Sequence, residues 1–227
     1  MFKYIQKDAF DQSCQVYQEP FNFVLAGNML SVADEAELDR DYPKYKEAGF
    51  LPYDPEECGP SINAFVEELT SEEFSNHVGA MLGIENLHQF PTLITLCHMF
   101  NKRFGTIHTD SKSKVATALI YMNHDWPDTS DGCLRFLKRI DDIEDVVVPE
   151  MRPTYGNFTI FKRADNSFHG HLPYEGERRV IQIAWLTSEE EKLRKNKRGT
   201  FTRKLKQLFG GLDKKVGANR DKNKSHM

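Results

Sequence analysis

Two short stretches of this 227-residue chain carry side chains of the types that bind metal ions and anions. The first is His-Thr-Asp at residues 108–110, and the second is NSFHGHLPYEGERR, from Asn166 to Arg179. Two imidazoles and one carboxylate on one side of a metal ion leave three coordination positions open. Non-haem Fe(II) centres use this arrangement to bind a chelating co-substrate together with O₂. The two stretches therefore predict an oxygenase-type metal centre.

The spacing of the first stretch suits two adjacent ligands. Residues two apart in a β-strand face the same way, so His108 and Asp110 would direct an imidazole and a carboxylate at one point. This signal alone is weak, because a chain with eight histidines meets such spacing by chance. His169 follows the apolar segment 157–161, so a later strand could bring it to the same ion. His171 could face the same way, which leaves two candidates for the distal ligand.

An arginine at the end of the second stretch offers an anion site. A guanidinium is planar, permanently charged and able to hold a carboxylate through two parallel hydrogen bonds. If residues 178–186 form a strand, Arg179 shares a face with two isoleucines and Trp185, where a charge is costly without an anion. The pattern predicts that Arg179 binds an anionic ligand. The alternatives are that Arg178 and Arg179 face solvent at the start of a strand, or that Arg179 pairs with an acidic residue of the protein itself.

These residues and their surroundings resemble the Fe(II)- and 2-oxoglutarate-dependent dioxygenases, close to bacterial members of the prolyl 4-hydroxylase-like group. The similar segments are HTDSKSKVATALIYMNHDW, GCLRF and PTYGNFTIFKRADNSFHGHLPYEGERRVIQIAW, within roughly residues 20–190. The resemblance implies Fe(II) ligands at His108, Asp110 and His169. It also implies that Arg179 and Tyr121 hold the C5 carboxylate of 2-oxoglutarate.

The spacing typical of the family favours one histidine as the distal metal ligand and one arginine as the 2-oxoglutarate anchor. In this family the distal histidine precedes the arginine by nine or ten residues and a proline often follows four later, which favours His169 because Pro173 fits. The alignment of RVIQIAW favours Arg179 over Arg178. The implied cofactors are Fe(II), 2-oxoglutarate and O₂, with ascorbate as a candidate reductant. The implied reaction hydroxylates an unidentified substrate, a peptidyl proline or a small molecule, and releases succinate and CO₂.

The pattern of apolar residues predicts an α+β fold with a mainly β core. Residues 1–90 are expected to be mostly helical with an early strand at 21–27, and Thr70 and Glu73 have capping-box spacing for a helix to Leu82. From residue 91, short runs rich in Val, Ile, Thr and Phe alternate with turn residues, which indicates an antiparallel sandwich or barrel. With the resemblance, we expect a double-stranded β-helix (jelly-roll) at about 91–187, within a single domain over 1–190 on which the N-terminal helices pack.

Charge divides the chain into an acidic body and a basic tail. Residues 192–227 contain 13 lysines and arginines against 2 aspartates, a net of +11, so the overall charge of −4 leaves −15 for residues 1–191. We expect residues 191–227 to be helical first and then disordered. Such a segment can lie in solvent or dock on a polyanion such as nucleic acid, anionic lipid or the acidic body.

Other features limit the remaining classes of function. No apolar run approaches the roughly 18 residues of a transmembrane helix, and the first residues lack a secretory apolar segment, so a cytoplasmic location is expected. Two alternatives stay open beside the oxygenase. One is a cupin-like metal-binding protein that does not use 2-oxoglutarate, which Arg179 and Tyr121 disfavour. The other is a polyanion-binding module whose basic tail carries the function.

Overall fold

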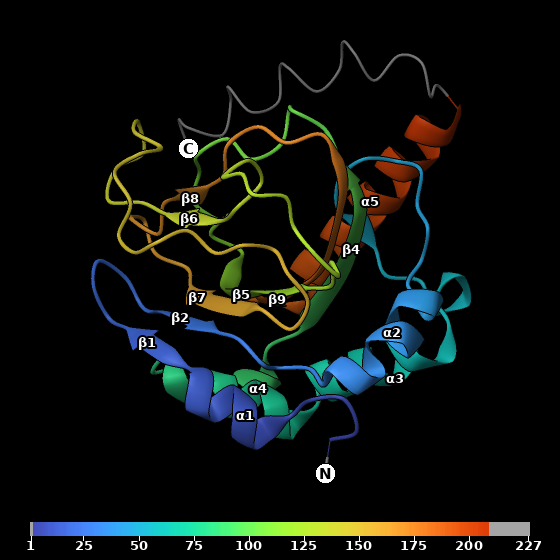
Figure 1. Cartoon of the computed structure of the whole chain (residues 1–227), viewed down its shortest axis with the longest axis horizontal. Coiled ribbons are helices and arrows are strands. Elements are labelled where there is room, and N and C mark those ends of the chain that lie inside the picture. Colours follow the sequence, from blue (N-terminus) through green and yellow to red (C-terminus); the bar gives the residue numbers. More distant parts are fainter. Residues whose placement is uncertain (1, 209–227) are drawn as a thin grey trace.

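The computed structural model of this protein describes residues 2–208, with side chains described for residues 2–204. Its main feature is a seven-stranded antiparallel sheet in the order β1-β2-β7-β5-β9-β4-β3 (Figure 1). Its strands are β1 (Gln15–Tyr17), β2 (Phe23–Ala26), β3 (Leu51–Pro52), β4 (Thr92–Phe100), β5 (Lys114–Tyr121), β7 (Phe158–Lys162) and β9 (Gly176–Leu186). A smaller sheet pairs β6 (Arg135–Phe136) with β8 (His169–Gly170).

Helices from the first part of the chain cover one face of the large sheet (Figure 1). These helices are α1 (Lys7–Ser13), α2 (Glu35–Asp41), α3 (Pro60–Thr70) and α4 (Glu72–Met81), with 3₁₀ turns η1 (Val32–Asp34), η2 (Pro55–Glu57) and η3 (Leu87–Gln89). A further helix, α5 (Glu189–Leu208), follows the last strand. The sheet-rich core with its helices confirms the predicted α+β class.

Alternation along β9 gives the large sheet two different buried faces. Ile181, Ile183 and Trp185 point toward the N-terminal helices and share a core cluster with Phe65 and Phe74. Val180, on the opposite face of β9, points toward the smaller sheet. It belongs to a second core cluster with residues of β5, β6 and β7, which includes Tyr121, Leu119, Phe161 and Phe136. Apolar burial on both faces holds the sheet between two layers. Functional side chains can therefore reach the space between the sheets only from the second face.

The start of α4 differs from the predicted capping box. Thr70 is the last residue of α3, and Ser71 caps α4 by accepting a hydrogen bond from the Phe74 backbone N–H at 3.2 Å. The extended backbone of Ser71 separates the two helices. Gly83 has a φ of 64°, so it follows α4 in the left-handed conformation predicted for a helix stop.

Two apolar runs of the region predicted to be rich in strands, residues 133–140 and 146–149, are largely irregular. Of residues 133–140 only β6 is a strand, and residues 146–149 contribute a single bridge between Leu137 and Val146. The buried Arg135 forms ion pairs with Glu144 and Glu150 of the following loop, each at 2.7 Å. These ion pairs link β6 to the loop that follows it.

The basic region begins as a helix that packs on the body. Along α5, Arg203 pairs with Glu57, and Gly199 lies against the Pro52 ring. The predicted helical start of the tail is therefore present, whereas the predicted disordered part lies in residues 209–227, outside the described residues. Within the described part of the chain, no helix combines the length and apolarity needed to cross a bilayer.

Candidate active site

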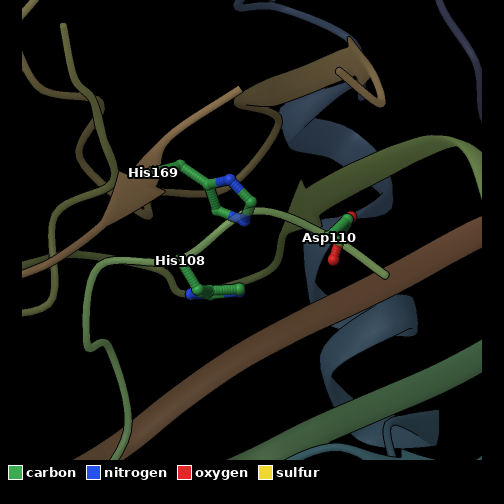
Figure 2. A group of neighbouring side chains, drawn as sticks. All are labelled: His108, Asp110 and His169. Carbon is green, nitrogen blue, oxygen red and sulfur yellow. The ribbon is translucent and has the colours of Figure 1, made fainter. Parts of the chain in front are cut away.

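Three predicted metal ligands come together between the two sheets. A nitrogen from each of His108 and His169 and a carboxylate oxygen of Asp110 all lie within 4.8 Å of one another. Figure 2 shows the three side chains directed into a common space. Asp110 and His169 are buried, while His108 is exposed. The cluster is therefore anchored in the protein interior and open to solvent on the His108 side.

Both imidazoles are oriented by the backbone. The Nδ1 atom of His108 lies 2.8 Å from the Thr106 carbonyl oxygen, and the Nδ1 atom of His169 lies 2.9 Å from that of Ser167. A carbonyl oxygen only accepts, so Nδ1 carries the proton on each ring and Nε2 keeps its lone pair. Such an outer hydrogen bond is typical of metal-binding histidines.

Asp110 is held as a carboxylate by two donors. The Lys114 ammonium lies 2.7 Å from one carboxylate oxygen, and the Thr117 hydroxyl donates to the other at 2.5 Å. Burial by itself would raise the pKa of Asp110, but Lys114, His169 and Thr117 together hold that pKa far below its usual value. The group is therefore a charged oxygen ligand at neutral pH.

The backbone that presents these ligands is not the continuous strand that the spacing predicted. His108 forms an isolated antiparallel bridge with His169, with both N–H···O distances 3.0 Å, and Asp110 lies outside any strand. Directly paired residues of neighbouring strands project to the same side, so the two rings lie with their centroids 4.4 Å apart. Pairing across strands, rather than alternation within one, brings the histidines together.

His171 is buried but lies away from the cluster of three. Its Nδ1 atom is 2.7 Å from the Leu172 carbonyl oxygen, and its ring packs on Phe100 with the centroids 5.3 Å apart. Gly105 contacts this ring so closely that a Cβ there would lie 2.2 Å from it. His169 rather than His171 therefore shares a ligand cluster with His108 and Asp110.

Arg178 and Tyr121 form a second polar group on the inward face. Arg178 is 2% exposed and donates through Nε to the Gly132 carbonyl oxygen at 3.0 Å. Tyr121 pairs with Val180, two residues along β9 from Arg178, and the guanidinium carbon lies 5.4 Å from the Tyr121 ring centroid. Among the described residues, Arg178 has no carboxylate within ion-pair distance. The buried Tyr121 hydroxyl likewise has no hydrogen-bond partner of regular geometry there.

Arg179, the predicted anchor of the 2-oxoglutarate carboxylate, does not face the space between the two sheets. Arg179 lies on the opposite face of β9 from Arg178 and forms ion pairs with Asp39 and Glu177. The sequence argument took the face carrying Ile181 and Trp185 as the pocket, but that face packs on the N-terminal helices. Arg178 is the arginine that shares the inward face with Tyr121.

The two groups fit the ligands that the sequence implied. Two imidazoles held through Nδ1 by backbone carbonyls, together with a charged carboxylate, match the donor set of Fe(II). A buried guanidinium without an anion, beside an unsatisfied buried hydroxyl, matches the distal carboxylate of 2-oxoglutarate, because unpaired buried groups of this kind are costly. Thr117 lies on the same face of β5 as Tyr121, so one strand serves both groups.

Comparison with known proteins agrees with this geometry. The profile of the 2OG-Fe(II) oxygenase superfamily matches residues 95–187, which contain every residue of both groups. The chain carries a 2OG-Fe(II) oxygenase domain. Residues 95–187 thus form a 2-oxoglutarate-dependent oxygenase domain. No curated protein is significantly similar to this chain.

Several solved prolyl hydroxylases resemble the oxygenase. A Pseudomonas putida prolyl-4-hydroxylase has 16% identity over 73% of this chain and 92% of its own, with a TM-score of 0.53, so the two share a fold. A Trichoplax adhaerens prolyl hydroxylase has 14% identity over 75% of this chain and 86% of its own, with a TM-score of 0.49. The viral collagen prolyl hydroxylase of Paramecium Bursaria Chlorella virus-1 has 13% identity over 73% of this chain and 96% of its own, with a TM-score of 0.47.

Sequence reasoning missed the residues that support the ligands. Thr117 and Lys114 hold Asp110, but neither is among the predicted site residues. A usable signal exists for Thr117, since it is the polar residue on the inward face of an otherwise apolar strand, two and four residues from Leu119 and Tyr121. Lys114 carries no such signal, because a lysine at a strand start is usually solvated.

Proposed function

We propose that this oxygenase hydroxylates its substrate with 2-oxoglutarate as co-substrate, releasing succinate and CO₂. Fe(II) would be held by His108, Asp110 and His169, and the distal carboxylate of 2-oxoglutarate by Arg178 and Tyr121. The observation that carries the proposal is the buried Arg178 guanidinium, which lacks a carboxylate partner among the described residues and lies beside the Tyr121 hydroxyl, itself without a hydrogen-bond partner of regular geometry there. A metal site alone would not require such an anion pocket.

The protein's own contribution is positioning. When bound, Fe(II) supplies with O₂ the oxidising chemistry that couples decarboxylation of 2-oxoglutarate to hydroxylation. Backbone carbonyls hold both imidazoles in one tautomer, and Lys114 and Thr117 keep Asp110 charged and oriented. Apolar walls around Tyr121 and Phe161 limit the access of water to the inward side. Exposure of His108 leaves one side open for a substrate.

The arrangement of the sheets supports a finer description of the fold. The large and small sheets face one another across the cluster that contains Phe136 and Phe161. We infer that they form the two halves of a double-stranded β-helix, or jelly-roll. The pairing of β8 with both β6 and the His108 segment supports this assignment.

The substrate is proposed only as a class. Peptidyl proline is one candidate, by analogy with proteins that share the fold, and a small molecule is the other. Ascorbate remains the candidate reductant, and the cytoplasmic location stays a prediction.

The decisive experiment compares two neighbouring arginines. We expect Arg178→Ala to weaken 2-oxoglutarate binding about 10- to 100-fold, because charge-assisted hydrogen bonds contribute about 1.5–3 kcal/mol. Arg179→Ala is the matched control and should bind within about twofold of wild type, since its side chain faces away. Binding is measured calorimetrically with the Fe(II)-loaded protein, and turnover as succinate released without added substrate.

Different outcomes separate the alternatives. Equal loss of 2-oxoglutarate affinity in both variants, or loss only in Arg179→Ala, would contradict the assigned anchor. A protein that binds Fe(II) but shows neither affinity for 2-oxoglutarate nor succinate release would instead be a cupin-like metal-binding protein. His108→Ala should abolish succinate release while leaving the fold intact, because the His108 side chain is exposed.

A further inference from the structure

Helix α5 presents two chemically different faces. Its inner face contacts the body, where Lys195 donates to the Ser111 hydroxyl at 3.0 Å and Arg203 binds both carboxylate oxygens of Glu57. Gly199 lets the helix approach Pro52, since a Cβ there would lie 2.6 Å from the ring. These contacts fix how α5 is rotated about its axis. They also determine which residues of the helix face outward.

The outward face combines apolar and cationic side chains. Leu193 is 58% exposed and Phe201 is 67% exposed, and they are two of the five exposed large hydrophobic residues in the described part of the chain. They lie eight residues apart on a rigid helix, about 12 Å along its axis. The exposed cations of the same face are Arg194, Lys197, Arg198 and Lys204. The exposed acids of α5 are confined to its first turn, at Glu189 and Glu190.

We propose that the outward face of α5 docks on an anionic phospholipid bilayer. Helices that lie in a membrane interface carry Leu and Phe side chains that enter the acyl boundary, with Lys and Arg that contact anionic headgroups. Exposed Leu193 and Phe201 supply the first element, and the four cations around them supply the second. The helix would lie along the surface, consistent with the finding that no described helix can span a bilayer.

Charge elsewhere in the molecule orients the docking. Residues 1–191 carry a net charge of −15, so an anionic surface repels the body and attracts the α5 side. In Figure 1, α5 lies beside β4 at one end of the sheet, away from β6, β7 and β8. One edge of the protein therefore meets the membrane.

A bilayer suits this face better than a nucleic acid. Phosphate contacts would use the cations, and Phe201 could stack on a base, but the aliphatic Leu193 has no comparable role in single-strand binding. On a bilayer, by contrast, both Leu193 and Phe201 would be buried at the acyl boundary while the cations contact the headgroups. Nucleic acid is nevertheless an outcome that the test distinguishes.

The test uses the full chain and sedimentation with vesicles. Wild type should bind vesicles of mixed phosphatidylglycerol and phosphatidylcholine and should not bind phosphatidylcholine alone. We expect the double variant Leu193→Gln, Phe201→Gln to lower binding about tenfold or more, because apolar insertion is lost. Lys197→Glu with Arg198→Glu should lower binding roughly a hundredfold through charge.

Matched controls exclude nonspecific effects. Val16→Gln with Val32→Gln removes two exposed apolar residues elsewhere, and Lys138→Glu with Lys162→Glu makes the same change in net charge near the other end of the sheet. Both controls should bind as wild type does. Equal binding by wild type and the Leu193, Phe201 variant would overturn the proposal. So would absence of vesicle binding, or binding only to single-stranded DNA in fluorescence anisotropy.

Discussion

Burial lowers the pKa of His169 to about 3 and that of His171 to about 4, with further lowering by His108 and Arg178 respectively. His169 is thus neutral at pH 7, while the lowered pKa of Asp110 keeps that group charged. Metal-ligating atoms must be deprotonated, so binding of a divalent ion at neutral pH requires no proton release from these two residues. Burial thus keeps His169 neutral and Lys114 helps to keep Asp110 charged, which are the protonation states that a metal ion requires.

The same burial makes stability depend on pH. The unfolded chain protonates His169 near its ordinary pKa of 6.5, whereas the folded protein does so only near 3, so stability falls as pH drops through this window. Between pH 7.5 and pH 5, we expect the free energy of unfolding of the metal-free wild type to fall by about 2 kcal/mol more than that of the His169→Gln variant. Urea unfolding in the presence of a chelator measures the difference.

An exposed histidine provides a control of opposite sign. A hydrogen bond to Glu35 raises the pKa of His124, so this pair stabilises the protein at low pH and the contribution disappears as pH rises through the folded pKa. His124→Gln should therefore lose more stability on acidification than wild type. Identical pH profiles for wild type and His169→Gln would contradict burial of a neutral His169.

Thr117 tests whether the support of Asp110 is functional. Thr117→Val keeps the shape of the side chain but removes the donor to Asp110, so we expect metal affinity to fall about 10- to 100-fold. Thr159→Val is the matched control, because its buried hydroxyl donates to the Val24 carbonyl, with no link to the cluster. Metal titration with Co(II) or Mn(II) measures both. Equal affinities would mean that Lys114 alone orients the carboxylate.

At the scale of elements, a single residue separates α3 from α4. Ser71 caps α4 while its backbone N–H bonds to the Glu68 carbonyl, so it ends one helix and begins the next. We expect Ser71→Ala to cost about 1 kcal/mol of unfolding free energy, because the cap is lost. Thr70→Ala should cost less, since the Thr70 hydroxyl bonds only to carbonyls of its own helix. Thermal unfolding distinguishes this assignment from the predicted Thr70 cap.

At the scale of the whole molecule, a metal should stabilise the fold. The three ligands come from segments about 60 residues apart that meet only in the folded state. At a metal concentration of about 100 times Kd, binding contributes about 2.7 kcal/mol, which corresponds to a rise in Tm of roughly 5–10 °C for a chain of this size. Asp110→Ala should show no rise with Mn(II). A similar rise in wild type and this variant would place the metal elsewhere.

The sequence by itself determined the chemical composition of the site and the class of the fold. His108 and Asp110 were predicted from residue types and spacing, His169 was preferred to His171 through the family resemblance, and the structure brings the ligand atoms of all three together. The main strands β4, β5, β7 and β9 followed from local patterns of β-branched and apolar residues. These features are local, because side-chain chemistry and strand alternation are properties of short segments.

Only the tertiary structure decided which arginine faces inward and how the ligands are supported. Arg178 and Arg179 differ only in parity along β9, and parity has no meaning until one face is covered by helices and the other by the small sheet. Likewise, His108 and His169 meet through pairing between distant segments, and Asp110 depends on Thr117 and Lys114 of the next strand. Long-range packing sets these relations, so no short segment encodes them.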